Sequence, residues 1–266
     1  MMKLSCNYLS LSDLDIKSFI QTVFELRLDA IDFHTSAFIS QDPGYLREIR
    51  SLCLELGLSI GYIGVSPGFV GSPEDLRLRV SAAKSAIDLA EIVGSPMIRV
   101  FGGHVPDQIN DWNPLYQDLY TCLSELAQYG VDKGVVVALQ NHDNNNLAAT
   151  AENVIQILDA VDHPNLSHIM DTGQWKGSIG AATRGEFDPT VDIYQQMEKT
   201  IRRAIYVRTK FYRIENGREE WLDYPRIVNI LHKANFNGNL SIVYEGDEED
   251  RIGAVRKAAA HLRPLL

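Results

Sequence analysis

The chain has 266 residues, of which 45% are hydrophobic and 23% charged, values typical of a soluble globular protein. Its 35 acidic and 25 basic residues give a formal net charge of −10 at pH 7. This charge argues against a nucleic-acid-binding protein and against attraction to anionic membrane surfaces. No run of about 18 apolar residues predicts a membrane span, and the N-terminal residues lack the pattern of a secretory signal.

The three cysteines, Cys6, Cys53 and Cys122, lie far apart and form no Cys-x-x-Cys motif. This spacing excludes a zinc ribbon and a disulfide scaffold, so we expect a cytoplasmic protein. No linker rich in proline, glycine or serine divides the sequence. We therefore expect residues 1–266 to form a single domain.

Short apolar or β-branched runs alternate along the chain with longer segments of helical periodicity. The runs that predict strands are Lys3–Tyr8, Ala30–His34, Leu58–Val65, Met97–Gly102, Val135–Asn141, Leu166–Asp171, Ala204–Lys210 and Asn239–Glu245. The segments that predict helices are Leu14–Leu26, Tyr45–Leu56, Pro73–Val93, Leu115–Lys133, Thr150–Val161, Asp192–Lys199, Tyr224–Ala234 and Asp250–Leu262. Ser72 before Pro73 is a helix-start signal, and Gly94 and Gly134 are helix-end signals.

Eight strands that alternate with about eight helices predict an α/β fold, a single (β/α)8 TIM barrel. The rival architecture is an open, doubly wound sheet. Such a sheet usually carries a glycine-rich turn after its first strand, whereas residues 7–10 contain no glycine. The sequence therefore favours the barrel.

The active site of such a barrel lies at the carboxyl ends of its strands, where residues two apart share a face. The pairs expected to face inward are Asp32/His34, Arg99/Phe101, Gln140/His142, Ile169/Asp171, Arg208/Lys210 and Val243/Glu245. Our catalytic candidates are Lys210, Glu245, His142 and Asp171. Our substrate-binding candidates are His34, Phe101, His104, Gln140, Trp175 and Arg208.

Each candidate also has a purely structural interpretation. A histidine at a strand end is often only a hydrogen-bonded structural group, and Asp171 before Thr172 and Gly173 is a candidate turn cap. Arg208 and Lys210 are candidates for ion pairs with Asp171 and Glu245 that serve stability alone. Because a buried charge at a strand end is costly without a partner or a task, we favour a functional group of residues.

The motifs at the strand ends resemble those of the xylose isomerase-like barrel superfamily. That superfamily includes sugar phosphate isomerases, ketose epimerases, related dehydratases and an endonuclease branch. The similarity extends over nearly the whole chain and depends on the order and spacing of five motifs. They are Val100-Phe101-Gly102-Gly103, Ala138-Leu139-Gln140-Asn141-His142, Asp171-Thr172-Gly173-Gln174-Trp175, Tyr206-Val207-Arg208-Thr209-Lys210 and Ser241-Ile242-Val243-Tyr244-Glu245-Gly246.

The resemblance implies one divalent metal ion, held by a glutamate on strand five, an aspartate on strand six, a histidine on strand seven and a glutamate on strand eight. Such an ion polarises a carbonyl or stabilises an enediolate. The corresponding positions here are Gln140, Asp171, Arg208 and Val243. Because arginine stays protonated, it does not ligate a metal. We therefore expect no metal and no other cofactor, with the Arg208 guanidinium beside Asp171 in place of the ion.

The sequence leaves three functions open. The first is a sugar or sugar-phosphate isomerase or epimerase, or a lyase on a polyhydroxy acid, that acts without the usual metal. The second is a catalytically inactive carbohydrate-binding or regulatory barrel. The third, nucleic-acid repair, is disfavoured by the net charge of −10 and the missing ligands. We expect a small sugar or sugar-acid ligand and no nucleic-acid or membrane partner; the sequence indicates no particular oligomeric state.

Two loops are further candidates for function. Residues 174–192 follow strand six and form either a lid or an ordinary surface loop. Asn216-Gly217, followed by Glu219 to Trp221, predicts a hairpin-like flap after strand seven.

Overall fold

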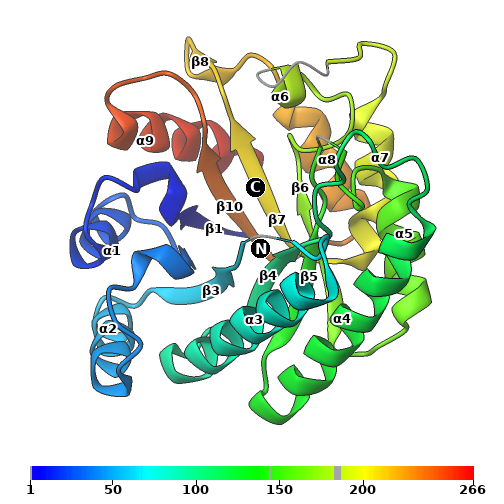
Figure 1. Cartoon of the computed structure of the whole chain (residues 1–266). Helices are drawn as coiled ribbons and strands as arrows, with labels where there is room; N and C mark the ends of the chain where they lie inside the picture. Colours follow the sequence, from blue (N-terminus) through cyan, green and yellow to red (C-terminus); the bar gives the residue numbers. More distant parts are fainter. Residues whose placement is uncertain (1, 67, 144, 183–186) are drawn as a thin grey trace.

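Eight parallel strands close into a barrel in the computed structural model, which describes residues 2–66, 68–143, 145–182 and 187–266. The order of strands around the barrel is β1-β10-β7-β6-β5-β4-β3-β2. Figure 1 shows the strands at the centre and the long helices α2 to α5 around their outside. The structure therefore confirms the predicted (β/α)8 TIM barrel.

The element bounds agree with the predicted segments to within about two residues. The barrel strands are β1 Lys3–Asn7, β2 Ala30–His34, β3 Ser59–Gly64, β4 Met97–Phe101, β5 Val136–Gln140, β6 Leu166–Asp171, β7 Ala204–Phe211 and β10 Asn239–Tyr244. The helices are α1 Ile16–Glu25, α2 Pro43–Glu55, α3 Pro73–Val93, α4 Asn113–Lys133, α5 Ala151–Val161, α6 Ile179–Ala182, α7 Ile193–Thr200, α8 Tyr224–Lys233 and α9 Arg251–Leu262.

The helix ends follow from local chemistry. At the start of α3 the Ser72 hydroxyl accepts a hydrogen bond from the Asp75 backbone N–H, and the Asp75 carboxylate accepts one from the Ser72 N–H. These reciprocal bonds satisfy N–H groups that the first turn of a helix leaves free. Gly94 and Gly134 end α3 and α4 with positive φ angles of 82° and 65°, a conformation that glycine adopts without strain.

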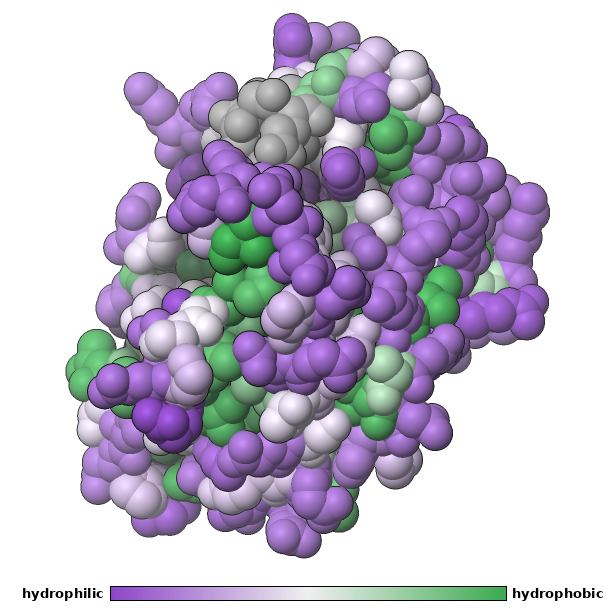
Figure 2. Space-filling view, turned by 45° about the vertical axis from the view of Figure 1, so that its right-hand side comes forward, coloured by the Kyte–Doolittle hydropathy of each residue, from purple (hydrophilic) through white to green (hydrophobic). Residues whose placement is uncertain are grey.

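Two apolar regions hold the barrel together. A large one lies between the strands and the helices, and a small one of Tyr62, Met97, Ala138, Ile169 and Tyr206 lies inside the barrel. Polar groups also lie inside the barrel, as in the hydrogen bonds that Ser5 and Tyr206 donate to Asp32, each 2.6 Å long. On the face seen in Figure 2, hydrophilic residues surround separate apolar patches. No helix in the described ranges has both the length and the hydropathy of a bilayer-crossing segment.

A hairpin follows β7, as predicted. Strands β8 (Ile214–Glu215) and β9 (Arg218–Glu219) pair antiparallel across a turn in which Asn216 and Gly217 both have positive φ angles. The Glu219 carboxylate accepts hydrogen bonds from the backbone N–H groups of Tyr212, Arg213 and Trp221, which fixes the hairpin to the end of β7. The predicted lid lies partly outside the described residues, since 183–186 are not among them.

Candidate functional site

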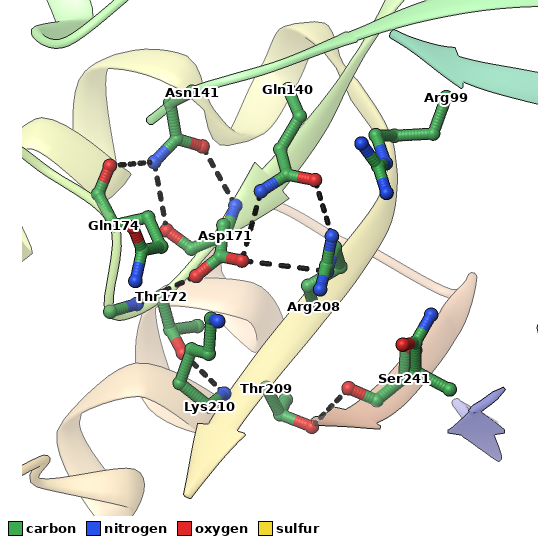
Figure 3. Close-up of polar contacts among 12 residues, drawn as sticks. Arg99, Gln140, Asn141, Asp171, Thr172, Gln174, Arg208, Thr209, Lys210 and Ser241 are labelled. Atoms are coloured by element: carbon green, nitrogen blue, oxygen red, sulfur yellow. Dashed lines mark hydrogen bonds and ion pairs between the residues drawn. The ribbon is translucent and has the colours of Figure 1, made fainter. Parts of the chain in front are cut away.

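Asp171, Arg208 and Gln140 form a buried network at the ends of β6, β7 and β5. The Arg208 Nε lies 3.4 Å from Asp171 Oδ2. Gln140 bridges the two charges, because its Nε2 donates to Asp171 Oδ2 at 3.1 Å while its Oε1 accepts from Arg208 Nη1 at 2.5 Å (Figure 3). The structure confirms the expected position of the Arg208 guanidinium beside Asp171.

Burial dominates the electrostatics of this network. The Asp171 side chain has no exposed surface and that of Arg208 only 3%. Burial raises the pKa of Asp171, and the positive charges of Lys210 and Arg208 oppose that rise. Two charges withdrawn from water in this way are tolerable only when each has a partner, which the ion pair and the bridging amide supply here.

Asn141 fixes the backbone around Asp171. Its Nδ2 donates to the carbonyl oxygens of Asp171 and Gln174 at 3.0 Å each, and its Oδ1 accepts from the Asp171 N–H at 2.7 Å. The sequence analysis did not select Asn141, although its place in the polar run that ends strand five was a usable signal. Its amide holds the turn after β6 against the end of β5.

Lys210 and Glu245 form the second ion pair of the site, between the Lys210 Nζ and Glu245 Oε1. The Lys210 side chain is 3% exposed, whereas that of Glu245 is 37% exposed. Val243, on β10, lies opposite Lys210 in the strand pairing. Lys210 is held in place at its backbone, where its N–H donates to Thr172 Oγ1 and its carbonyl accepts from the Tyr224 hydroxyl. The pair thus joins a buried cation to a carboxylate that reaches solvent.

The three candidate histidines occupy different surroundings. His34 is half-buried, its Nδ1 lies 2.8 Å from Ser36 Oγ, and burial together with the charges of Arg99 and Arg208 lowers its pKa to about 4. His142 packs edge-on against Phe101, with its Nδ1 3.1 Å from the buried carboxylate of Asp143. His104 is exposed and lines a separate groove of about 380 Å³. Because its pKa is lowered to about 4, His34 is an uncharged imidazole at neutral pH.

The two aromatic candidates also differ. Phe101 is half-buried, and the Arg99 guanidinium lies 4.1 Å from the centre of its ring. Trp175 is fully buried in the main hydrophobic core beside His168, an outward-facing residue of β6. The structure therefore groups Phe101 with the charged residues and places the Trp175 ring in the core packing.

The four positions that the resemblance associates with a metal ion give a poor donor set. Asp171 supplies the one carboxylate among them, and its Oδ2 is already engaged by Gln140 and Arg208. A divalent cation here would meet the positive charge of Arg208 and compete for the same oxygen. No group of three His, Cys, Asp or Glu side chains within the described ranges has a metal-binding arrangement. The residues present do not fit the ion.

Comparisons with known proteins agree on the fold. A family model described as xylose isomerase-like TIM barrel matches residues 20–265, whereas no curated protein matches the chain. The structure of 3-keto-D-glucoside 4-epimerase from E. coli is similar with a TM-score of 0.81 at 16% identity, covering 99% of this chain and 100% of that one. D-Allulose 3-epimerase from Methylomonas sp. gives a TM-score of 0.79 at 15% identity, covering 100% and 98%.

Proposed function

Because the chain belongs to the xylose isomerase-like TIM barrel family, we propose that it is a sugar or sugar-phosphate isomerase or epimerase. Its substrate would be a small polyhydroxy carbonyl compound bound at the carboxyl ends of the strands. The observation that carries this proposal is the pair of Lys210 and Glu245, a buried cation joined to a carboxylate open to solvent. The similarity to sugar epimerases supports the substrate class.

The geometry supports a proton-transfer mechanism. Glu245 is the base that takes the proton from the carbon next to the substrate carbonyl, which leaves an enediolate. The Lys210 ammonium and the nearby Arg208 stabilise the negative oxygen that develops. His142 follows the end of β5, three strands from β10 in the barrel order, and its Nδ1 lies 3.1 Å from the Asp143 carboxylate, so it is placed to return a proton from another side.

Deuterium exchange tests this reaction. The purified protein is incubated in D2O with a panel of ketoses and aldoses, and incorporation at the carbon next to the carbonyl is followed by NMR. Glu245→Gln and Lys210→Met should each slow exchange by about 100-fold or more, the usual contribution of a general acid or base. Lys17→Met, which removes an exposed lysine paired with Glu48, is the matched control and should leave exchange unchanged.

We also propose that the reaction proceeds without a divalent metal, because the positions that hold the ion in the family are altered in this chain. The network of Asp171, Arg208 and Gln140 supports this, because a cation already neutralises the carboxylate. Manganese titration, followed by electron paramagnetic resonance, tests it. The wild-type protein should show no specific binding, whereas the triple variant Gln140→Glu, Arg208→His and Val243→Glu should bind Mn²⁺ at a four-ligand site. Exchange activity that requires added metal and ends with a chelator would contradict the proposal.

A second candidate function is a catalytically inactive carbohydrate-binding or regulatory barrel. It is favoured by the fact that Arg208 and Lys210 each already have a carboxylate partner within the protein. A sugar that raises the melting temperature yet shows no deuterium exchange in the wild-type protein would select this alternative. For either function we place the protein in the cytoplasm, supported by its three buried cysteines, all present as free thiols.

A further inference from the structure

Three cations project into the barrel near the carboxyl ends of its strands: Arg99 from β4, and Arg208 and Lys210 from β7. Arg208 has Asp171 as its partner, and Lys210 has Glu245. Among the residues that the structure describes, no carboxylate lies within 4.0 Å of Arg99. Figure 3 shows its guanidinium pointing from β4 toward the pair of Gln140 and Arg208, with no polar contact to the other residues drawn. Of these three cations, Arg99 is the one without a direct ion-pair partner among the described residues.

Arg99 is held in this position although its polar groups are poorly satisfied. The residue is 1% exposed, its Nη1 donates to the Val65 carbonyl at 3.2 Å, and its Nε has no hydrogen-bond partner. Burial and the charge of Arg208 lower the pKa of Arg99 to about 9, which still leaves it charged at neutral pH. A buried cation with an unused donor destabilises the free protein, so its retention points to a ligand that supplies the missing partner.

Gly64 and Phe101 fix the orientation of the Arg99 guanidinium. A Cβ atom on Gly64 would lie 2.6 Å from Arg99 Nη2 and 3.2 Å from His34 Cδ2, so glycine at this position lets the guanidinium lie close to the end of β3. Phe101 covers one face of the guanidinium at 4.1 Å. The arrangement leaves the edge, where the N–H groups point, as the side for recognition of an anion.

We propose that Arg99 binds the carboxylate of a polyhydroxy acid, which makes the natural ligand of this barrel a sugar acid. This inference rests on the sugar site of the proposed function and names its substrate class. A planar guanidinium edge matches a carboxylate in bidentate geometry. The single charge of one guanidinium matches that of one carboxylate, whereas a phosphate monoester carries a charge of about −1.5 to −2 at pH 7.

Calorimetric titration with paired probes tests the inference without any need for turnover. The pairs are D-glucuronate with D-glucose, D-galacturonate with D-galactose, and D-gluconate with D-glucitol, each in the presence of a chelator. In at least one pair the acid should bind about ten-fold or more tightly than its neutral partner, since charged hydrogen bonds contribute this much. D-Glucose 6-phosphate is the phosphate arm and should bind more weakly than the preferred acid.

Two variants at Arg99 and one control variant tie the preference to this residue. Arg99→Met should reduce the affinity for the acid to that for the neutral partner, while Arg47→Met, an exposed arginine of α2, should leave both affinities unchanged. Arg99→Lys keeps the positive charge but loses the two parallel N–H donors of the guanidinium, so it should retain part of the preference for the acid. It is also the variant to measure if Arg99→Met does not fold.

Three results would overturn the inference: equal or absent binding of acid and neutral sugar in every pair, a preference that survives in Arg99→Met, or tighter binding of the sugar phosphate. These outcomes are separable from the fate of the proposed reaction. An acid preference without deuterium exchange would remove the isomerase and keep the sugar-acid site. Deuterium exchange on neutral sugars alone, without an acid preference, would keep the isomerase and remove the sugar-acid site.

Discussion

The two ion pairs at the end of β7 are built from neighbouring positions yet differ in their exposure to water. Arg208 and Asp171 are both buried, and the Gln140 amide bridges them. Lys210 is equally buried, but its partner Glu245 has more than a third of its side chain exposed. A closed pair cannot exchange its partner for a ligand without a large cost, whereas a half-open pair can. This difference supports our proposal that Lys210 and Glu245 carry the reaction, whereas Asp171 mainly holds Arg208 in place.

The largest expected effect comes from opening the closed pair. Asp171→Asn preserves size but leaves Arg208 as a buried cation without its carboxylate. We expect the free energy of unfolding at pH 7 to fall by about 3–5 kcal/mol, the usual cost of removing one partner of a buried pair. Urea denaturation followed by circular dichroism measures this change.

A double variant shows whether the lone charge is the cause. Asp171→Leu combined with Arg208→Met removes both charges and should cost less stability than Asp171→Asn alone. An equal or greater loss in the double variant would mean that Asp171 stabilises the barrel through its packing or its bond to the Gly173 N–H rather than through Arg208.

Asp32 provides the next test, because it is a buried carboxylate held by hydroxyl groups. Burial raises its pKa from 3.8 to about 6, so between these values the folded state binds more protons than the unfolded state. Its contribution to stability is therefore full below about pH 4 and lost as the pH rises through about 6, a change of about 3 kcal/mol. Urea denaturation measures the free energy of unfolding of Asp32→Asn and of the wild-type protein. The difference between the two should shift in favour of the variant by about 3 kcal/mol from pH 4 to pH 7. A constant difference over that range would show that Asp32 has an ordinary pKa.

The smallest effect should come from the half-open pair. Glu245→Gln should lower the free energy of unfolding by about 1–2 kcal/mol, less than Asp171→Asn, because the glutamine oxygen can still accept from the buried Lys210 ammonium at the end of the pair that reaches solvent. The same variant is expected to lose most deuterium exchange. A loss of stability as large as that of Asp171→Asn, measured under the same conditions, would make both pairs structural and remove the contrast between them.

The strands and the pairing of Arg208 with Asp171 were predictable from the sequence. Apolar runs of the buried strands in a parallel barrel have clear limits, and the two-residue alternation determines which side chains share a face. The alternation correctly placed Arg208 with Lys210 on one side of β7. Parallel pairing then brings Asp171 of β6 directly opposite Arg208.

Other features of the site depend on loops and on atoms far apart in the sequence. The unused Nε donor of Arg99 results from contacts of β4 with the end of β3, which no local pattern encodes. Trp175 follows strand six closely enough to suggest a place at the site. The turn after β6 instead brings Lys176 to bond with the Ala149 carbonyl, and the Trp175 ring packs in the core.

The amide of Gln140 has a consequence for how this site can evolve. Its NH2 group faces Asp171 and its oxygen faces Arg208, so a neutral side chain that both donates and accepts is required at this position. A glutamate here would place a second carboxylate against Asp171, and a histidine at position 208 alone would leave Asp171 without its constant positive partner. Each single step back toward a metal-binding barrel therefore passes through a destabilised protein. The three residues are held together by mutual dependence, and natural variation should change them jointly.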